Sequence, residues 1–443
     1  MLVSRLKVKN FRSMKNVELK FKPLTILVGP NASGKSNILL ALDWLLKKQI
    51  NNKIYSVSRD HKIQHGVLEF RDYIFSRNPQ KKLEMEVEFC IPKELSSYFH
   101  EFISKLSKIS GTKTKFEKFI YGFAYSLPIA RQPTYGSYKI YIKIDDFDVK
   151  VEQRHNGRNF IRKFSGRLGS DKVNYNAEPF LFSAECFGGS QKYQDIYNLF
   201  YDLFATFEKQ ILDRIFFLSS LRGRVKSDAE AIMKHDVGPE GENIIEVSST
   251  MLASYDLDVR KTLGNKYLFW LRNFGINDFS AGLAGDKNIK ATYLDASGSR
   301  LNLSLASYGN RQIASVIAQL IVTPEHSLVM IEEPEISLHP EHQALLPVLF
   351  ADLIKDLKKQ VIVTTHSVVM ILALMDAVLG HPEISHKTLS ANEIVVYHVE
   401  RVNGQTMVKE LELTKEGLPK KGVPSFVEAE RKLFRRFIER IHK

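Results

Sequence analysis

Residues 29–36 have the residue types and the spacing of a loop that binds phosphate groups. Their sequence, GPNASGKS, fits the pattern GxxxxGK[ST] and stands between the apolar run LTILV and the apolar segment SNILLALDWLLKK. Glycines let backbone N–H groups face phosphate oxygens without a Cβ in the way, and the N-terminus of the following helix adds partial positive charge. In this motif Lys35 would reach the β- and γ-phosphates, and the Ser36 hydroxyl would be a ligand of Mg²⁺. A strand before the loop and a helix after it are the context that the motif requires, so we expect the chain to bind ATP or GTP.

A pair of carboxylates, Glu332 and Glu333, stands at the end of a second apolar run. The stretch SLVMIEEPEISLHP, residues 327–340, places four apolar residues directly before them and Pro334 directly after. A phosphate loop needs a further carboxylate at the end of a neighbouring parallel strand, where it holds the magnesium ion. We therefore assign Glu332 to Mg²⁺, through water, and Glu333 to polarising the attacking water. The alternative is a solvated strand end whose two carboxylates have no chemical role.

A third polar group, His366, follows the apolar run QVIVTT of residues 360–365. The segment between the two runs, residues 342–359, predicts a crossover helix, so His366 should emerge at the same edge of a parallel sheet as the glutamates. An imidazole there can hydrogen-bond to the γ-phosphate or to the attacking water. The predicted catalytic residues are therefore Lys35, Glu333 and His366, and a structural histidine is the alternative.

Periodicity predicts the elements that position these groups. Apolar and polar residues alternate with period two in LKVKNF, VELKF and KLEMEVEFCI, which indicates strands, and PKELSSYFHEFISKLSKI predicts an amphipathic helix that starts at Pro92. A β-rich, tyrosine-rich tract follows, and the last third of the chain alternates strand and helix as in a parallel sheet covered by helices. The predicted division is residues 1–91 with the phosphate loop, 92–205 as an α+β insertion, 206–400 with the glutamates and histidine, and 401–443 as a strand and a basic amphipathic helix.

The combination of GPNASGKSN, IEEPEISLHP and TTHS resembles the ABC-type ATPase heads of the RecF and SMC class. It is most similar to the AAA family ATPases of the OLD and RecF-like group. The stretch NFRSMKNVELKFKPLTILVGPN also resembles the opening strands of that group. The resemblance covers about residues 1–90 and 210–400. It implies an α/β fold, a P-loop NTPase head of the ABC type with a mixed central sheet, helices on both faces and an α+β insertion.

The resemblance also implies a signature loop that opens a helix shortly before the strand with the glutamates. Ser307-Tyr308-Gly309-Asn310 stands where the family has Ser-Gly-Gly-Gln, and it departs from that pattern at Tyr308, with Gln312 two places late. Ser307 would cap the helix and contact the γ-phosphate bound to the other subunit, and a plain N-cap serine is the alternative. The stretch SLHP would be the D-loop, with Ser337 and His339 as candidates to sense the partner's nucleotide.

Two further positions follow from the family's motif order. Gln80, in the turn SRNPQKK, is the best position for the Q-loop glutamine, and Arg12 would approach the nucleotide, with a surface arginine as the alternative. The residues expected at the nucleotide are Gly29, Pro30, Asn31, Ala32, Ser33, Gly34, Lys35, Ser36, Asn37, Arg12, Ser307, Gly309 and Ser337. The residues expected at the metal are Ser36, Glu332 and Gln80.

The charge and composition of the chain indicate which classes of partner it can have. The formal net charge of +13 favours polyanions such as nucleic acid, although many soluble proteins are mildly basic. A basic stretch predicts an exposed hairpin with five candidate DNA contacts, Arg154, Arg158, Arg162, Lys163 and Arg167. Asp145, Asp146 and Asp148 are better explained by a turn between strands than by a metal site. No apolar run is long enough to span a membrane, the N-terminus lacks an apolar signal core, and Cys90 and Cys186 form no metal or redox spacing, so we expect a cytoplasmic location and no membrane contact.

A signature loop that acts on the other subunit implies that two heads face each other with two ATP molecules between them. We therefore expect a homodimer or higher homo-oligomer that opens after hydrolysis. The predicted insertion is too short and too β-rich for the coiled-coil arms of SMC proteins, and the segment after His366 lacks the acidic triad of the TOPRIM nuclease that OLD proteins append. A head without an effector resembles the stand-alone sensor ATPases of anti-phage systems such as PARIS and Septu.

The leading hypothesis is accordingly an ATP-driven sensor or scaffold that regulates a separate effector, a nuclease or toxin, in anti-phage defence, with DNA or a foreign protein as trigger. One alternative is a RecF-like DNA-repair clamp that binds DNA directly, and another is a non-catalytic, nucleotide-gated assembly module. The apolar side of the C-terminal helix is a candidate dock for a partner, with packing on its own head as the alternative; it comprises Phe426, Leu433, Phe434, Phe437 and Ile441.

Overall fold

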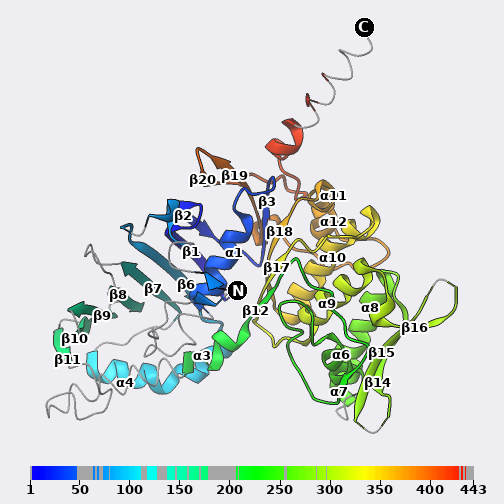
Figure 1. Ribbon diagram of the computed structural model, residues 1–443, viewed down its shortest axis with the longest axis horizontal. Coiled ribbons are helices and arrows are strands. Elements are labelled where there is room, and N and C mark those ends of the chain that lie inside the picture. Colours follow the sequence, from blue (N-terminus) through cyan, green and yellow to red (C-terminus); the bar gives the residue numbers. More distant parts are fainter. Residues whose placement is uncertain are drawn as a thin grey trace. The chain divides into compact units, whose positions relative to one another are not determined.

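The chain folds into two compact units (Figure 1). The first unit comprises Met1–Phe21, Ser36–Asp213 and Arg401–Met407, and the second comprises Lys22–Lys35, Arg214–Glu400 and Val408–Lys443. The computed structural model describes residues 2–46, 63–64, 67–68, 73–78, 80–110, 117–126, 137–144, 147–156, 159–168, 171–177, 206–207, 209–253, 257–285, 287–295, 297–428, 431–432 and 435.

The first unit is built on an eight-stranded sheet with the order β11-β10-β9-β8-β7-β6-β1-β2. All neighbouring strands in this sheet are antiparallel. Its strands are β1 (Val3–Phe11), β2 (Met14–Lys20), β6 (Leu83–Cys90), β7 (Lys118–Ser126), β8 (Ser137–Ile144), β9 (Phe147–Asn156), β10 (Asn159–Leu168) and β11 (Asp171–Ala177). Buried and half-exposed residues alternate strictly along β6, which confirms the half-exposed strand that the period-two pattern predicts there.

The strands of the predicted insertion extend the sheet that the N-terminal strands begin. β7 pairs with β6 from Leu83 opposite Tyr125 to Cys90 opposite Lys118. The connection between them is helical, through α3 (Lys93–Ser96), a 3-10 turn and α4 (His100–Ser110), and it starts directly after Pro92 as predicted. The domain boundaries at 91/92 and 205/206 remain predictions.

The second unit is built on a six-stranded sheet with the order β12-β17-β18-β3-β19-β20. Its strands are β12 (Ile215–Leu218), β17 (Leu328–Glu332), β18 (Gln360–Thr365), β3 (Leu24–Val28), β19 (Ile394–Val402) and β20 (Gln405–Leu411). The first five strands are parallel to one another. The two-residue turn Asn403-Gly404 between β19 and β20 makes the last pair antiparallel. The sheet is therefore mixed, and the predicted α/β class is confirmed.

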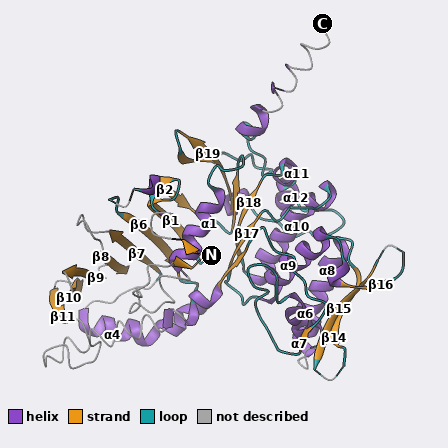
Figure 2. Ribbon diagram, viewed as in Figure 1, coloured by secondary structure: helices purple, strands orange, loops and turns teal. Residues whose placement is uncertain are grey.

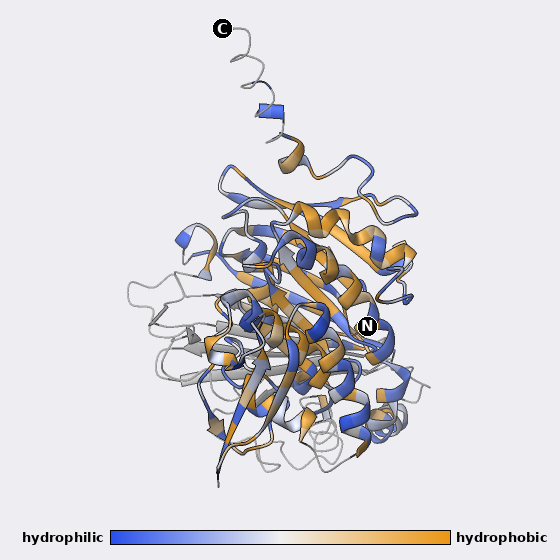
Figure 3. Cartoon of the chain, turned by 90° about the vertical axis from the view of Figure 1, so that its right-hand side faces the viewer, coloured by the Kyte–Doolittle hydropathy of each residue, from blue (hydrophilic) through white to orange (hydrophobic). Residues whose placement is uncertain are grey.

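The central strands β3, β17 and β18 are buried along almost their whole length, because helices cover parallel strands. Figure 3 shows that the interior of the described part of the chain is mostly in the hydrophobic colour. The sheet order corrects one expectation. β18 lies between β3 and β17, so the strand that carries the two glutamates is the second neighbour of the strand before the phosphate loop and not the first. The carboxyl ends of all three strands still lie at one edge of the sheet.

Helices of the second unit pack against this sheet and on one another, and Figure 2 shows them in purple beside the strands in orange. They include α6 (Ile244–Leu252), α8 (Asn265–Asn273), α9 (Tyr308–Val322), α10 (Pro340–Leu357), α11 (Val368–Leu372) and α12 (Leu374–Leu379). A second, antiparallel sheet that the sequence does not predict is formed by β13 (Ala229–Glu230), β14 (Asn277–Leu283), β15 (Asn288–Leu294) and β16 (Arg300–Asn302). Trp270 and Phe350 are among the fully buried side chains of the core between these elements.

Several predicted surface features lie partly outside the described residues. Arg154 lies in β9 and Arg162, Lys163 and Arg167 lie in β10, whereas Arg158 is outside the described part. Asp145 and Asp146 are also outside it, and Asp148 lies in β9 opposite Lys143 and Arg167.

At the C-terminal end, Phe426 packs against the core of its own unit, which for this residue favours the alternative reading. The remaining predicted apolar residues of that helix, Leu433, Phe434, Phe437 and Ile441, lie outside the described part. Among the helices that the structure describes, none combines the length and the apolarity needed to cross a bilayer.

Candidate functional site

The phosphate loop connects β3 to α1 (Lys35–Asp43), as the sequence predicts. Gly29 is required by packing, because a Cβ on it would lie 2.0 Å from the carbonyl oxygen of Val399 in β19. Gly34 (φ +107°) and Ala32 (φ +59°) adopt the left-handed conformations that turn the loop back toward the helix. Pro30, Asn31, Ala32 and Ser36 are exposed, while Ser33 is buried.

Lys35 is buried inside this loop, with 4% of the residue exposed. Its Nζ donates hydrogen bonds to the carbonyl oxygens of Gly29 at 2.9 Å and Pro30 at 2.8 Å. Burial lowers the pKa of Lys35 to about 8, against the opposing charges of Glu333 and Glu335. The ammonium therefore stays charged at neutral pH. Among the residues that the structure describes, the hydrogen-bond acceptors of this ammonium are carbonyl groups, which carry no full charge. A buried cation in such surroundings suits a polyanionic ligand such as a triphosphate.

The two glutamates occupy the end of β17, where the chain leaves the sheet. Glu332 is the last residue of the strand paired with β18, opposite Thr364, and its Oε2 accepts a hydrogen bond from the backbone N–H of Ser220 at 3.3 Å. Glu333 adopts a left-handed conformation (φ +45°), and its N–H donates to the carbonyl oxygen of Thr364 at 3.0 Å. This conformation turns the Glu333 side chain away from the strand direction, so the two adjacent carboxylates have different surroundings.

His366 emerges beside Glu333, as the crossover connection predicts. Its Nε2 lies 3.0 Å from Oε1 of Glu333, and both side chains are about one third exposed or less. The hydrogen bond from His366 lowers the pKa of Glu333, and the charges of His366, Lys35 and Arg222 add to this effect while burial opposes it. Glu333 is therefore ionised at neutral pH and able to accept a hydrogen bond from water.

Glu335 holds the backbone next to His366, a role that sequence reasoning missed. Its side chain is buried, and its Oε1 accepts hydrogen bonds from Thr365 Oγ1 and from the backbone N–H of His366, both at 2.7 Å. The residue stands in the stretch EEPE, but a single acidic residue in a turn gives no sequence signal for such a contact.

Arg222, in the loop after β12, is a second residue that sequence reasoning missed. It is fully buried, and its guanidinium donates hydrogen bonds to the carbonyl oxygens of Glu332, Glu333 (2.8 Å) and Ser219 (3.0 Å). Burial lowers the pKa of Arg222 to about 10, so it remains charged at neutral pH. Burying such a charge costs on the order of several kcal/mol unless its hydrogen bonds are satisfied.

The predicted signature residues open α9. Ser307 caps this helix, because its Oγ accepts a hydrogen bond from the N–H of Asn310 at 3.2 Å. A Cβ on Gly309 would lie 2.4 Å from the carbonyl oxygen of Ser337, so the first turn of α9 packs on the predicted D-loop. Gln312 is fully buried and faces the loop after β12, and His339 caps α10 through the N–H of Glu341. The cap role of Ser307 is thus observed, and its contact with a partner's nucleotide remains a prediction.

Arg12, Asn37 and Gln80 belong to the first unit. Arg12 donates a hydrogen bond from Nη1 to Oδ1 of Asn37 at 3.1 Å, and Asn37 lies in the first turn of α1. Arg12 therefore contacts the helix that follows the phosphate loop, and its approach to the nucleotide remains a prediction. Gln80 lies in an exposed turn, where its N–H donates to Oδ1 of Asn78 at 3.0 Å. Its metal role stays a prediction.

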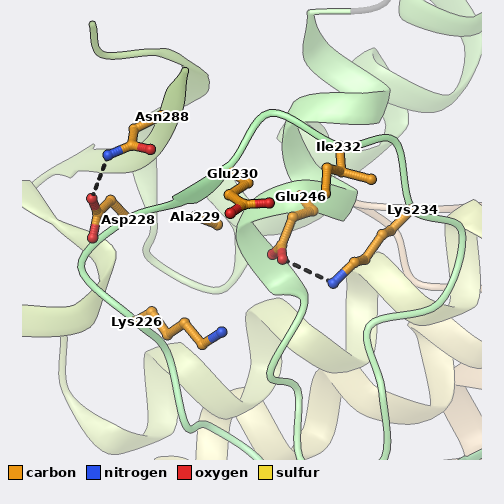
Figure 4. Close-up of a pocket in the computed structure, with 8 residues that line it drawn as sticks. All are labelled: Lys226, Asp228, Ala229, Glu230, Ile232, Lys234, Glu246 and Asn288. Carbon is orange, nitrogen blue, oxygen red and sulfur yellow. Dashed lines mark hydrogen bonds and ion pairs between the residues drawn. The ribbon is translucent and has the colours of Figure 1, made fainter. Parts of the chain in front are cut away.

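A pocket of about 380 Å³ lies elsewhere in the second unit (Figure 4). It is lined by Lys226, Asp228, Ala229, Glu230, Ile232, Lys234, Glu246 and Asn288. Four of these residues form two hydrogen-bonded pairs, in which Lys234 donates to Glu246 and Asn288 donates to Asp228, both at 3.0 Å. None of the lining residues belongs to the predicted motifs, so the chemistry of the candidate site does not depend on this pocket.

Comparisons with known proteins agree with the motifs. A sequence profile of the AAA ATPase domain matches residues 1–371. A segment of 45 residues is 49% identical to the OLD nuclease of Thermus scotoductus, covering 10% of this chain and 8% of that protein. A segment of 87 residues is 34% identical to the DNA replication and repair protein RecF of Pasteurella multocida, covering 18% of this chain and 24% of that protein.

The chain thus spans at most about a quarter of the length of these two curated relatives. Among solved structures, an SMC head bound to the C-terminal winged-helix domain of ScpA is 14% identical, covers 94% of this chain and 99% of its own, and has a TM-score of 0.48.

Proposed function

Since this chain belongs to the AAA ATPase domain family, we propose that it binds and hydrolyses ATP with Mg²⁺. The observation that carries the proposal is the contact of Glu333 with His366 at 3.0 Å, in the unit that also holds the buried ammonium of Lys35. The Glu333 carboxylate is ionised, and it lies close enough to Lys35 to affect the pKa of that lysine. It is therefore suited to orient water toward a γ-phosphate bound by Lys35.

Each motif residue has a proposed role in this reaction. Lys35 contacts the β- and γ-phosphates, Glu333 polarises the attacking water, and His366 orients Glu333 or contacts the γ-phosphate. The Ser36 hydroxyl and the Glu332 carboxylate would hold Mg²⁺, with Gln80 as a third candidate. Hydroxyl and carboxylate oxygens are the hard ligands that Mg²⁺ prefers, and the bound ion would neutralise charge on the phosphates.

We also propose that the active form contains two copies of the chain. Ser307 opens α9 at a position whose neighbours Tyr308 and Asn310 are partly exposed, and Ser337 lies directly against this turn. A γ-phosphate held by Lys35 of one copy and by Ser307 of its partner gives ATP a contact that ADP lacks. Such a differential contact is what a nucleotide-driven open and closed switch requires.

The proposed biological role is that of a cytoplasmic sensor or scaffold that regulates a separate effector, a nuclease or toxin, in anti-phage defence. The short segment similar to an OLD nuclease supports this reading. Direct DNA binding by a RecF-like clamp is the second candidate, supported by the RecF-like segment and by the register of β9 and β10, which puts Arg154, Lys163 and Arg167 at positions of one face. A non-catalytic assembly module is the third.

Phosphate release by the purified chain, with and without Mg²⁺ and duplex DNA, tests these proposals. We expect Mg²⁺-dependent hydrolysis that Glu333→Gln stops while ATP binding persists, and we expect this variant to form an ATP-dependent dimer on a sizing column. Glu325→Gln, at an exposed turn of the same unit, is the matched control. Failure to bind ATP would refute the proposal.

Stimulation of hydrolysis by DNA that falls steeply with salt, and that is lost when Arg154, Arg162, Lys163 and Arg167 are replaced by serine, would favour the clamp over the scaffold. Replacement of the exposed Lys409, Lys415, Lys420 and Lys421 by serine removes the same charge outside these strands and serves as the control.

A further inference from the structure

Residues 219–223 directly follow β12. On one side they contact Glu332 and Glu333 at the end of β17, here called the glutamate turn. β12 pairs with β17 only as far as Leu218 opposite Ile331, so Glu332 and Glu333 lie past the last residue paired with β12. Arg222 provides hydrogen-bond donors to the backbone of these two glutamates. One guanidinium nitrogen donates to the carbonyl oxygen of Glu332 and the other to that of Glu333, at 2.8 Å for the latter.

These hydrogen bonds fix the direction of the peptide planes on both sides of Glu333. The residue is held in a left-handed conformation, which costs a non-glycine residue energy and persists only where surrounding contacts impose it. A planar guanidinium can bridge two adjacent carbonyl groups, whereas a lysine ammonium is a single point charge. The orientation of the Glu333 carboxylate therefore depends on Arg222, although Arg222 does not touch the carboxylate itself.

The same segment contacts the start of α9 on its other side. A Cβ on Gly223 (φ +103°) would lie 3.1 Å from Cγ of Gln312 and 3.3 Å from Cε2 of Tyr308, so the backbone packs directly on the first turns of this helix. Gln312 also donates a hydrogen bond from Nε2 to the carbonyl oxygen of Ser220 at 3.4 Å. Ser220 in turn donates from its N–H to Oε2 of Glu332 at 3.3 Å.

We infer that Arg222 is a positioning residue for Glu333, and that residues 219–223 couple the first turn of α9 to the glutamate turn. This inference rests on the proposed function, in which Ser307 at the start of α9 faces the partner's nucleotide and Glu333 faces the nucleotide of its own chain. A displacement of α9 when Ser307 engages the partner's γ-phosphate moves Ser220 and Arg222, and with them the carboxylate that orients water. Each chain thereby links the occupancy of one site to the hydrolytic geometry of the other.

Arg222→Lys tests the positioning role, with Arg224→Lys as the control two residues away, where the side chain is exposed and paired with Glu240. We expect Arg222→Lys to lower kcat about 100-fold, the effect of a misplacement of about 1 Å. The Kd for ATP should change less than about twofold, because Lys35 and its loop are untouched. Equal kcat values for the two variants would overturn the inference, and so would a parallel loss of ATP affinity and kcat.

A nucleotide-free measurement separates this inference from the proposed function. The N–H of Glu333 is bonded to Thr364, so its hydrogen exchange reports how firmly the turn is held. We expect a peptide covering residues 328–338 to exchange faster in Arg222→Lys than in Arg224→Lys. Unchanged exchange overturns the positioning role even if the chain hydrolyses ATP. Faster exchange in a chain that hydrolyses no ATP refutes the proposed function and leaves the structural tether in place.

Gln312→Met tests the coupling from the helix side and also serves if Arg222→Lys does not fold. It removes the donor to Ser220 and leaves Arg222 intact. We expect kcat to fall roughly 10-fold, with unchanged ATP affinity, as is typical for loss of a supporting hydrogen bond. An unchanged kcat in the folded variant would overturn the coupling.

Discussion

The imidazole Nε2 of His366 lies 3.0 Å from Oε1 of Glu333, although the two residues belong to different strand ends. Strands β17 and β18 are parallel neighbours, so the residues that follow them emerge at one edge of the sheet. Glu335 holds the backbone N–H of His366 at 2.7 Å. The imidazole is thus fixed through its own backbone, and the carboxylate that it contacts is the one proposed to orient water.

This contact predicts a change in the pH dependence of hydrolysis. The hydrogen bond from His366 is the largest cause of the lowered pKa of Glu333, so its removal raises that pKa. A larger fraction of Glu333 is then protonated at mildly acid pH, and a protonated carboxyl cannot accept a hydrogen bond from water. In His366→Ala we therefore expect the acid limb of kcat to move to higher pH, measured between about pH 4 and 7.

His386→Ala, which changes an exposed histidine of the same unit, should leave the acid limb in place and provides the control. If the limb were at the same pH in the wild type and in His366→Ala, the proposed effect of the imidazole on Glu333 would be wrong.

Glu335 predicts a measurable effect on stability. In Glu335→Ala the Thr365 hydroxyl and the His366 N–H lose their common acceptor inside the protein. Each unsatisfied buried group costs about 1–3 kcal/mol, so we expect the free energy of unfolding of the second unit to fall by roughly 2–4 kcal/mol in urea titrations. Glu335→Gln keeps an oxygen acceptor at the same place and should lose clearly less. Equal losses in both variants would show that charge, and not the acceptor, is what the site needs.

The burial of Lys359 predicts that the free energy of unfolding changes with pH above neutrality. The residue is buried, and its Nζ donates hydrogen bonds to the carbonyl oxygens of Thr323 and Pro324. Burial is the main cause that lowers its pKa from 10.5 to about 7. Between these two values the unfolded chain binds more protons at this position than the folded chain does. The contribution of Lys359 to the free energy of unfolding therefore rises with pH across this window.

Urea titrations at about pH 7 and pH 9 measure this contribution. We expect the rise in stability from the lower to the higher pH to be smaller in Lys359→Met than in the wild type. Lys355→Met changes a half-exposed lysine paired with Glu393 and should keep the wild-type rise. The same rise in Lys359→Met and in Lys355→Met would contradict the prediction.

Local sequence patterns predict the main elements of the candidate site well. The phosphate loop, the glutamate pair and His366 each follow a short run of apolar residues, and such runs form the buried strands β3, β17 and β18. The parallel direction follows from the long crossover helix. The order of the strands does not, because apolar runs of equal length carry no information about which neighbours they pair with.

The supporting residues are less accessible to sequence reasoning. Arg222 and Glu335 are buried charged residues whose partners are mainly backbone groups, and the carbonyl groups that Arg222 bonds in the glutamate turn lie about 110 residues away in the chain. A single charged residue in a loop predicts exposure, and nothing in its neighbours indicates otherwise. Strands β14 and β15 have seven residues each, but alanine fills one buried position in each and β14 contains Gly282, so the contrast between apolar and polar positions is weak.

The central claim is that each ATP lies between two copies of the chain, with Lys35 from one and Ser307 from the other. Lys35→Ala alone should fail to bind ATP, and Ser307→Arg alone should bind ATP and fail to hydrolyse it. A mixed dimer of the two variants contains one intact site, formed by Lys35 of the Ser307→Arg chain and Ser307 of the Lys35→Ala chain.

Phosphate release by an equal mixture of the two inactive variants tests this claim most directly. The account predicts that hydrolysis returns to at most about a quarter of the wild-type rate, since random pairing makes half of the dimers mixed and each has one of two sites intact. The coupling through residues 219–223 lowers the rate of such a lone site further without abolishing it. A mixture that stays as inactive as its components, although the two chains are shown to pair, would contradict it.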